Sequence, residues 1–199
     1  MSHGHLIYLI GASGVGKDSL LGYLRSRRQL LRHLLIPQRY ITRPASSGGE
    51  QHTELSTQAF RDRLQAGGFA MHWQSHGYHY GIGIEIDQFL TQGYPVVVNG
   101  SRHYLETARS LYSNLCPVLV TAPHHQLRQR LLKRGRESPQ AIEQRLQRAE
   151  SLNDQLSNQW LIRLSNEGPL EQAGQRLLEI IRNPSGLNPR RRGSAAATR

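Results

Sequence analysis

Four short apolar runs recur along the chain, and each is followed at once by glycine, proline or small polar residues. Apolar runs of this length, bounded by turn-forming residues, are typical of strands buried inside a parallel sheet. The runs cover 6–10, 95–98, 117–121 and 160–164, and segments with helical spacing follow the first and the last at 19–28 and 170–181. Strands alternating with helices predict an α/β fold in which helices flank a parallel sheet.

The turn after the first apolar run carries the strongest chemical signal. Residues 11–18 read Gly-Ala-Ser-Gly-Val-Gly-Lys-Asp, a phosphate-binding P-loop in every position except the last, where Asp18 replaces the usual Ser or Thr. Its glycines allow turns that aim backbone N–H groups at phosphate oxygens, and Lys17 adds a positive charge. We therefore predict a P-loop NTPase that binds a nucleoside triphosphate. The predicted nucleotide-binding residues here are Gly11, Ala12, Ser13, Gly14, Val15, Gly16, Lys17, Asp18 and Ser19.

Two segments interrupt the alternation of strands and helices. Residues 52–86 are rich in Gly, His and Tyr and alternate in polarity, which indicates a small inserted substrate-binding subdomain, set with its flanks at about 38–90. From 126 to 149 the helical spacing is broken at Gly135 and Pro139, which predicts a helical lid at about 124–149. We expect one domain over 1–183 and a disordered basic tail over 184–199, where Pro, Gly, Ala and Ser dominate.

Composition narrows the class of protein. A length of 199 residues suits a single domain. Cys116 is the only cysteine, which excludes an intrachain disulfide and a cysteine-based metal cluster, and we expect it to be a structural thiol. No apolar run approaches the roughly 20 residues that span a bilayer, and the N-terminus has no secretory signal. These features predict a soluble cytoplasmic protein with no membrane partner.

The formal net charge of +11 raises the question of a nucleic-acid partner. Four arginines lie from Asn183 onward, so the remaining chain carries about +7. A basic cluster over 128–148 accounts for much of that charge, and a phosphate-rich small substrate explains it as well as RNA does. We therefore expect no specific nucleic-acid partner, although binding through the basic surface stays open as an alternative that rests on charge alone.

Several motifs together resemble the guanylate kinase pattern. They are the P-loop, Tyr40-Ile41-Thr42-Arg43-Pro44, Gly49-Glu50, Trp73 with Gly77-Tyr78-His79-Tyr80-Gly81, and the lid stretch from Arg130 to Arg145, followed by Asn166. The similarity runs from about residue 5 to 182, with the motifs in the family's order. The resemblance implies a guanylate kinase-like fold that uses ATP.

The resemblance fails where a guanine base would be recognised. The family holds the base with a Ser, a Glu and an Asp, and this chain has Arg39, His72 and Ser101 at the corresponding places. A site built to hydrogen-bond a base loses orders of magnitude in rate when those groups are lost. The phosphate-binding side is better kept, with Arg43 and Tyr80 in place and His52 where the family usually has a Tyr. The acceptor is therefore expected to be a phosphorylated molecule without a base.

A closer resemblance is to the ribose 1,5-bisphosphate phosphokinases. It rests on Gly-Lys-Asp-Ser at 16–19, Arg39 to Arg43, Tyr80 to Asp87, Val98 to Arg102 and Arg134 to Glu137. That family transfers a phosphoryl group from ATP to ribose 1,5-bisphosphate and yields 5-phospho-α-D-ribose 1-diphosphate. The resemblance implies a small phosphorylated sugar as the substrate, whereas the residues by themselves indicate only a P-loop kinase with a base-free, anionic acceptor.

Residue roles follow from the needs of phosphoryl transfer, in which positioning and charge neutralisation supply most of the catalysis. Lys17, Arg134 and Arg145 are the predicted catalytic residues, and Arg130 and Asn166 join the nucleotide site. Arginine forks suit phosphate groups. The predicted acceptor-binding residues are Arg39, Arg43, His52, His72, Tyr80, Ser101, Arg102 and Arg136.

Asp18 has two interpretations. The usual Mg²⁺-binding Asp at the end of a neighbouring strand is missing, since 99–101 read Asn-Gly-Ser, so Asp18 is our candidate Mg²⁺ ligand. The alternative is that it only favours the start of the helix, where a carboxylate is stabilised in any case.

Two further functions remain open. One is a nucleoside monophosphate kinase of altered specificity, and the other is a guanylate kinase-like binding module without catalysis. Gly16, Lys17 and the lid arginines argue against the binding module, which has no use for them.

Overall fold

The computed structural model describes residues 4–27, 29, 33–47, 50–135, 137–156 and 160–184. Arg136 and nearly all of the predicted tail lie outside these described residues, so what the sequence predicts for them stays a prediction.

The four apolar runs form the strands of one sheet, as the sequence predicts. Their order in the sheet is β6-β1-β7-β8. The bounds are Leu6–Ile10 for β1, Val96–Asn99 for β6, Leu115–Thr121 for β7 and Ile162–Ser165 for β8. Every residue of β1 and β6 is buried, and β7 runs parallel to β8 with Val118 opposite Ile162. Burial on both faces explains why these strands are continuous apolar runs without polar alternation.

The chain divides into two compact units. One contains the chain up to Tyr8, Arg27–Asn99 and His103–Leu115, and the other contains Leu9–Ser26, Gly100–Arg102 and the chain from Cys116 onward.

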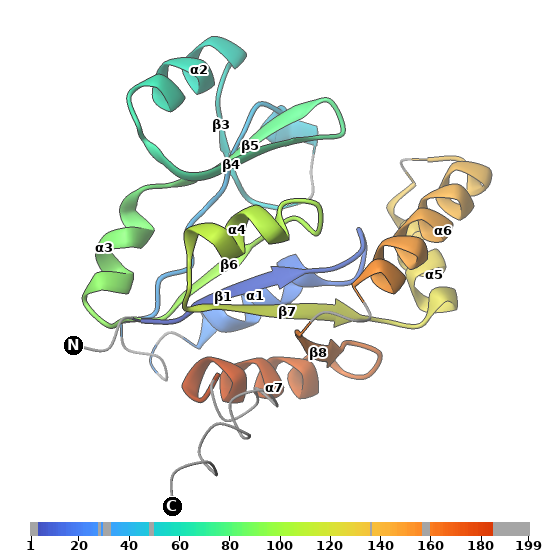
Figure 1. The fold of residues 1–199 in the computed structure, drawn as a ribbon. Helices are drawn as coiled ribbons and strands as arrows, with labels where there is room; N and C mark the ends of the chain where they lie inside the picture. The colour runs from blue at the N-terminus through green and yellow to red at the C-terminus, as the bar shows by residue number, and fades with distance from the viewer. Residues whose placement is uncertain are drawn as a thin grey trace, which may run out of the picture. The chain divides into compact units, whose positions relative to one another are not determined.

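In the second unit, α1 (Lys17–Ser26) packs against α7 (Leu170–Arg182). Gly174 is the point of close approach, because a Cβ there would lie only 2.5 Å from two ring atoms of Tyr23. The Tyr23 hydroxyl donates a hydrogen bond of 2.7 Å to Glu171. Gly174 and this hydrogen bond fix the helix of the P-loop against the last helix, which also packs on β8 (Figure 1).

The predicted lid is a pair of packed helices, α5 (His124–Arg134) and α6 (Pro139–Gln155), side by side in Figure 1. The first helix ends because Gly135 adopts a left-handed conformation with φ of 63°. The second begins at Ser138, whose side chain accepts a hydrogen bond from the Ala141 N–H, with Pro139 in the first turn. Gly135 and Pro139 thus break the helix where the sequence indicates.

The first unit carries a second sheet, with strand order β3-β2-β5-β4. Its strands are β2 (Tyr40–Ile41), β3 (Thr53–Glu54), β4 (Phe69–Ser75) and β5 (Tyr78–Gly83). The last two form the long hairpin of Figure 1. His76 and Gly77 both have positive φ in its two-residue turn, as expected of a turn that matches strand twist.

Three helices in this unit were not predicted from the sequence. They are α2 (Thr57–Gln65), α3 (Glu85–Thr91) and α4 (Leu105–Leu111), and a short 3-10 turn covers Ala45–Ser47. Ser56 starts α2 by accepting a hydrogen bond from the Ala59 N–H. Phe60 is the only residue of α2 that is fully buried, so the helix lacks the repeated apolar positions by which a pattern is recognised.

Cys116 lies buried in β7, in agreement with the expected structural thiol. Burial raises the pKa of its thiol to about 12. Among the described residues, no helix combines the length and the apolar character needed to cross a membrane.

Candidate active site

The P-loop connects the end of β1 to the start of α1 within the second unit. Positive φ angles at Gly11, Gly14 and Gly16, of 148°, 85° and 98°, produce the turns between them. At Gly16 a side chain is excluded twice, because the φ is unfavourable and a Cβ would overlap the side-chain amide of Asn166. The backbone therefore has the open cradle that a polyphosphate requires.

Asn166 and Arg130 brace this cradle. The Asn166 side chain is buried and donates a hydrogen bond of 2.8 Å to the carbonyl of Val15. Arg130 reaches the same carbonyl at 3.4 Å and donates to the carbonyl of Asn166 at 2.9 Å. Two residues far apart in sequence thus hold the central carbonyl of the P-loop.

Lys17 and Asp18 open α1. The Lys17 ammonium donates to the carbonyls of Gly11 at 2.9 Å and Ala12 at 3.2 Å, so it lies across the loop that would hold phosphate. Asp18 lies in the first turn of the helix, where the helix dipole favours a carboxylate. One carboxylate beside a phosphate cradle suits Mg²⁺, which proteins commonly bind through one or two carboxylates, substrate phosphates and waters. In the part of the chain that is described, no three His, Cys, Asp or Glu residues form a separate metal-binding group.

The predicted catalytic arginines of α5 and α6, Arg134 and Arg145, differ in their surroundings. Arg145 pairs with Glu137 across 2.8 Å at the start of α6. Arg134 is exposed in the last turn of α5 and makes no ion pair with any described residue. Arg145 would have to break its ion pair with Glu137 to bind a ligand, whereas Arg134 would not.

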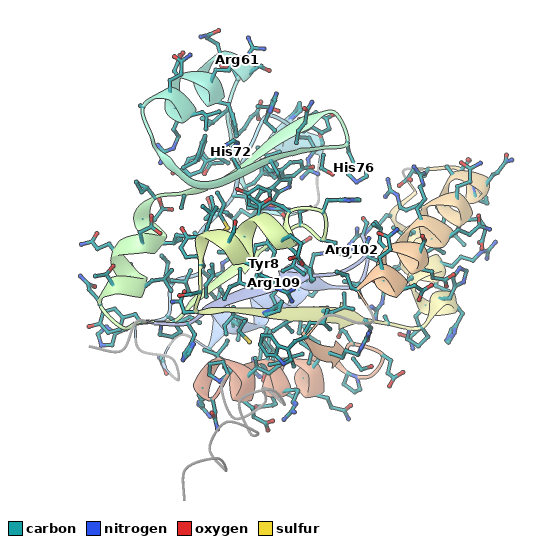
Figure 2. All side chains as sticks on the ribbon, in the orientation of Figure 1. Tyr8, Arg61, His72, His76, Arg102 and Arg109 are labelled. Atoms are coloured by element: carbon teal, nitrogen blue, oxygen red, sulfur yellow. The ribbon has the colours of Figure 1, made fainter. Side chains whose placement is uncertain are left out.

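Arg102 makes its hydrogen bonds with α6, the second helix of the predicted lid (Figure 2). Its Nη1 donates to the carbonyl of Ala149 at 2.8 Å and to the side-chain oxygen of Asn153 at 2.9 Å, both on α6. Burial lowers the pKa of this guanidinium below its ordinary value. Its predicted contact with the acceptor stays a prediction, and the structure adds a tie to the lid helix that the sequence does not indicate.

In the first unit, Arg39 forms a two-point ion pair with Glu50. Arg39 Nε donates to Glu50 Oε1 at 2.6 Å, and Nη2 contacts Oε2. Asn99, the last residue of β6, donates to the same Oε2 at 2.7 Å. The side chains of Arg39 and Glu50 are only 14% and 11% exposed, so the pair is largely shielded from solvent.

Aromatic rings support this ion pair. Trp73 and Tyr80 lie opposite each other on β4 and β5, with parallel rings 5.6 Å apart between centroids. The Arg39 guanidinium lies 5.0 Å from the Tyr80 ring centroid and 5.9 Å from that of Trp73. Burial raises the pKa of the Tyr80 phenol, opposed by the charges of Arg39 and Arg43, so at neutral pH it is a hydrogen-bond donor.

Arg43 and His52 lie at the two ends of the loop after β2. Arg43 Nε is buried and donates to none of the described residues, so its N–H is an unused hydrogen-bond donor. His52 is 8% exposed, and its ring nitrogens face the carbonyls of Glu50 at 3.0 Å and Arg43 at 2.9 Å. His52 thus holds the loop closed on itself, and its predicted phosphate contact stays a prediction.

His72 lies on β4 beside Trp73, and its side chain is exposed (Figure 2). Neighbouring side chains on a strand point to opposite faces, so His72 does not share the face that carries the Trp73 and Tyr80 rings. The structure therefore brings Arg39 and Tyr80 together but leaves His72 on the other face of the hairpin.

Sequence reasoning did not single out Glu50, which pairs with Arg39, or Asn99, which donates to Glu50. Glu50 lies 11 positions from Arg39, and Asn99 lies 49 positions from Glu50. The sequence signal that could have indicated the pairing is that Glu50 is the only acidic residue of the Ser/Gly turn that follows Arg39 and Arg43.

Comparisons with known proteins give the chain its family. No protein-family model matches it. It is 47% identical over 182 residues to the ribose 1,5-bisphosphate phosphokinase PhnN of Psychromonas ingrahamii, covering 92% of each chain. It is 54% identical over 168 residues to the protein of the same name from Pectobacterium parmentieri, covering 83% of this chain and 87% of the relative. The chain belongs to the ribose 1,5-bisphosphate phosphokinase family.

The fold of this ribose 1,5-bisphosphate phosphokinase family member is similar to those of solved kinase structures. A guanylate kinase from Anaplasma phagocytophilum matches 92% of the chain and 87% of its own length, with a TM-score of 0.66 and 15% identity. A sugar kinase from Janibacter matches 93% of the chain with a TM-score of 0.52 and 16% identity. The predicted guanylate kinase-like P-loop fold is confirmed.

Proposed function

We propose that the protein transfers the γ-phosphoryl group of ATP to ribose 1,5-bisphosphate, giving ADP and 5-phospho-α-D-ribose 1-diphosphate. The observation that carries the proposal is the identity of 47% over 182 residues to a phosphokinase of that name, which covers 92% of this chain. The chemistry is a single displacement. An oxygen of the acceptor's 1-phosphate attacks the γ-phosphorus, and the bond from that phosphorus to the bridging oxygen of ADP breaks.

The nucleotide side is assigned to the P-loop. Backbone N–H groups from Ala12 to Asp18 hold the α- and β-phosphates, while Lys17 leaves the loop carbonyls to reach the γ-phosphate. Arg130 and Asn166 keep the loop in shape through the carbonyl of Val15. Asp18, together with the phosphates, would hold Mg²⁺, which would supply charge neutralisation.

The lid is assigned to α5 and α6, at about 124–149. Arg134 and Arg145 stabilise the charge of the transferring group and exclude water when the lid closes. Because the acceptor is already an anion, the reaction needs no general base.

The acceptor side is assigned to the insert at about 38–90 together with the turn after β6. The assigned residues are Arg39, Arg43, His52, His72, Tyr80, Ser101, Arg102 and Arg136. The unused Nε donor of Arg43 supports a ligand oxygen at this place. No specific nucleic acid or membrane takes part, and we assign the protein to the cytoplasm.

A coupled assay of ADP release tests the function. The purified protein is offered ribose 1,5-bisphosphate, GMP, AMP and deoxynucleotides under equal conditions. We expect the highest kcat/KM with ribose 1,5-bisphosphate. Faster turnover of GMP would replace this function by nucleotide kinase activity, and no turnover of any acceptor would favour a binding module.

The Asp18 assignment has its own test. Replacing Asp18→Ser restores the usual P-loop residue, and we expect the Mg²⁺ concentration for half-maximal rate to rise by about threefold or more, because a carboxylate ligand is lost. Asp62→Ser on the exposed side of α2 is the matched control. An unchanged Mg²⁺ requirement in the Asp18 variant leaves that residue only its role at the helix start.

A further inference from the structure

The edges of the Arg39 guanidinium are used unequally. A guanidinium offers two edges that can bind an anion at two points, one formed by Nε with an Nη and one formed by the two Nη groups. Glu50 occupies the first edge through Nε and Nη2. Nη1 donates to no described residue, so the second edge is open.

Glu50 itself is held in place. Its Oε2 accepts from both Arg39 and Asn99, and its Oε1 accepts from Arg39, so three of its four acceptor positions are used. With a single acceptor position left, Glu50 is poorly placed to bind a ligand hydroxyl as its main task. Its contacts serve instead to fix the orientation of Arg39.

The aromatic pair fixes Arg39 in the remaining direction. The guanidinium lies against the rings of Tyr80 and Trp73, so rotation out of its plane is opposed while Glu50 opposes rotation within it. An arginine that is ordered before the ligand arrives loses less conformational entropy on binding.

Glu50 has two opposite effects on Arg39: it offsets the positive charge of the guanidinium, and it fixes its orientation. The carboxylate offsets the charge of Arg39, so a site that only needed positive charge to attract a bisphosphate would bind better without it. Arg43, with its unused Nε donor, already lies in the same unit as a source of charge.

We propose that Glu50 is the positioning residue of the acceptor site, holding Arg39 so that its Nη1–Nη2 edge binds a phosphate of the acceptor. The proposal rests on the proposed function for the identity of that acceptor. A negative residue thereby improves the binding of a negative substrate, because the orientation that it imposes outweighs the charge that it cancels.

The test is Glu50→Gln, which keeps size and one acceptor oxygen but removes the charge. We expect the KM for ribose 1,5-bisphosphate and its dissociation constant, measured by titration calorimetry, to rise by about tenfold, as the loss of one charge-assisted pair would cause. The KM for ATP stays within about twofold. Glu106→Gln on α4, the same change at a side chain that is 68% exposed, is the matched control and leaves both constants unchanged.

A double-mutant cycle separates positioning from a structural role. In an Arg39→Met background, Glu50→Gln should add no further loss of acceptor affinity, whereas Glu50→Asp in the wild-type background should recover part of it. If Glu50→Gln fails to fold, Arg39→Lys replaces it, because lysine keeps the charge but cannot form the two-point pair, and the same rise in KM is expected.

The outcomes distinguish the two proposals. Unchanged or tighter acceptor binding in Glu50→Gln overturns the positioning role and leaves the proposed function intact. A wild-type protein that binds ribose 1,5-bisphosphate without transferring phosphate overturns the function, and the calorimetric series still decides the role of Glu50. A wild-type protein that does not bind it overturns both.

Discussion

Asn166 joins the end of β8 to the P-loop through a single side chain. Its side-chain amide donates to the backbone carbonyl of Val15, and its backbone carbonyl accepts a hydrogen bond from Arg130. The backbone N–H of Asn166 is bonded to Thr121, which continues the parallel pairing of β7 with β8. The sheet thus sets the position of the side chain that shapes the phosphate cradle.

This arrangement predicts the effect of Asn166→Asp. The carboxylate would face the Val15 carbonyl without a proton to donate, in a place that is only 5% exposed. We expect a loss of about 2–3 kcal/mol in the free energy of unfolding and a higher KM for ATP. Denaturant unfolding and steady-state kinetics measure the two effects. Gln92→Glu, an exposed amide-to-acid change after α3, serves as control, and equal stability of the two variants would contradict the role given to Asn166.

For single residues, the sequence predicts which chemical group stands at a position better than it predicts which residue that group contacts. The P-loop residues are recognisable because their spacing is set by local backbone geometry. Glu50 is different, since its contacts with Arg39 and Asn99 form only in the folded protein. His72 shows the same limit, because its strand register places it on the other face from Trp73.

Among the helices, α1 and α7 illustrate how a small residue controls packing. Gly174 lets the ring of Tyr23 lie directly on α7, and the hydroxyl of that ring is then within reach of Glu171. The position of α1 matters for the proposed function because the helix begins at Lys17, the predicted catalytic lysine.

We predict that Gly174→Ala destabilises the protein by about 1–3 kcal/mol, because the Tyr23 ring must move away from the new Cβ. Gly22→Ala in the middle of α1 is the matched control, since its Cβ would meet nothing within 4 Å. There the better helix propensity of alanine should add about 0.5–1 kcal/mol. Thermal unfolding of both variants tests this contrast, and a stabilised Gly174→Ala protein would contradict the packing described.

The elements themselves were largely predictable. The strands of the main sheet, α1, the two lid helices and α7 follow from buried runs, amphipathic spacing and the breaks at Gly135 and Pro139. The helices of the first unit were missed because their apolar positions are few, as in α2 with Phe60 alone fully buried. The start of α2 depends on the Ser56 cap, while α3 and α4 have no side-chain cap and are only 7 residues long, too short for a repeating pattern.

For the whole molecule, net charge is the property that follows most directly from the sequence. The net charge is +11, and four of the arginines lie from Asn183 onward, outside the assigned catalytic elements. Much of the remaining positive charge serves phosphate groups in the proposed function. Affinity for nucleic acid, where it is found, should then come from the C-terminal arginines.

A chain ending at residue 184 tests this division of charge. We expect its KM values for ATP and the acceptor to stay within about twofold of the full chain, because none of the assigned residues is removed. Its salt-dependent binding to an arbitrary RNA, followed by fluorescence anisotropy, should fall to near background. Retained RNA affinity in the shortened chain would assign nucleic-acid binding to the folded body.

Cys116 gives the whole molecule a convenient property. The Cys116 thiol is buried in β7, and burial raises its pKa to about 12, so in the folded protein it is both shielded and a poor nucleophile. An alkylating reagent added to the native protein is therefore limited by how often β7 becomes exposed. Because Cys116 is the only cysteine, the rate at which one alkyl group is added, followed by mass spectrometry, would report how fast the main sheet opens. The rate can be compared with and without nucleotide, and no engineered label is needed.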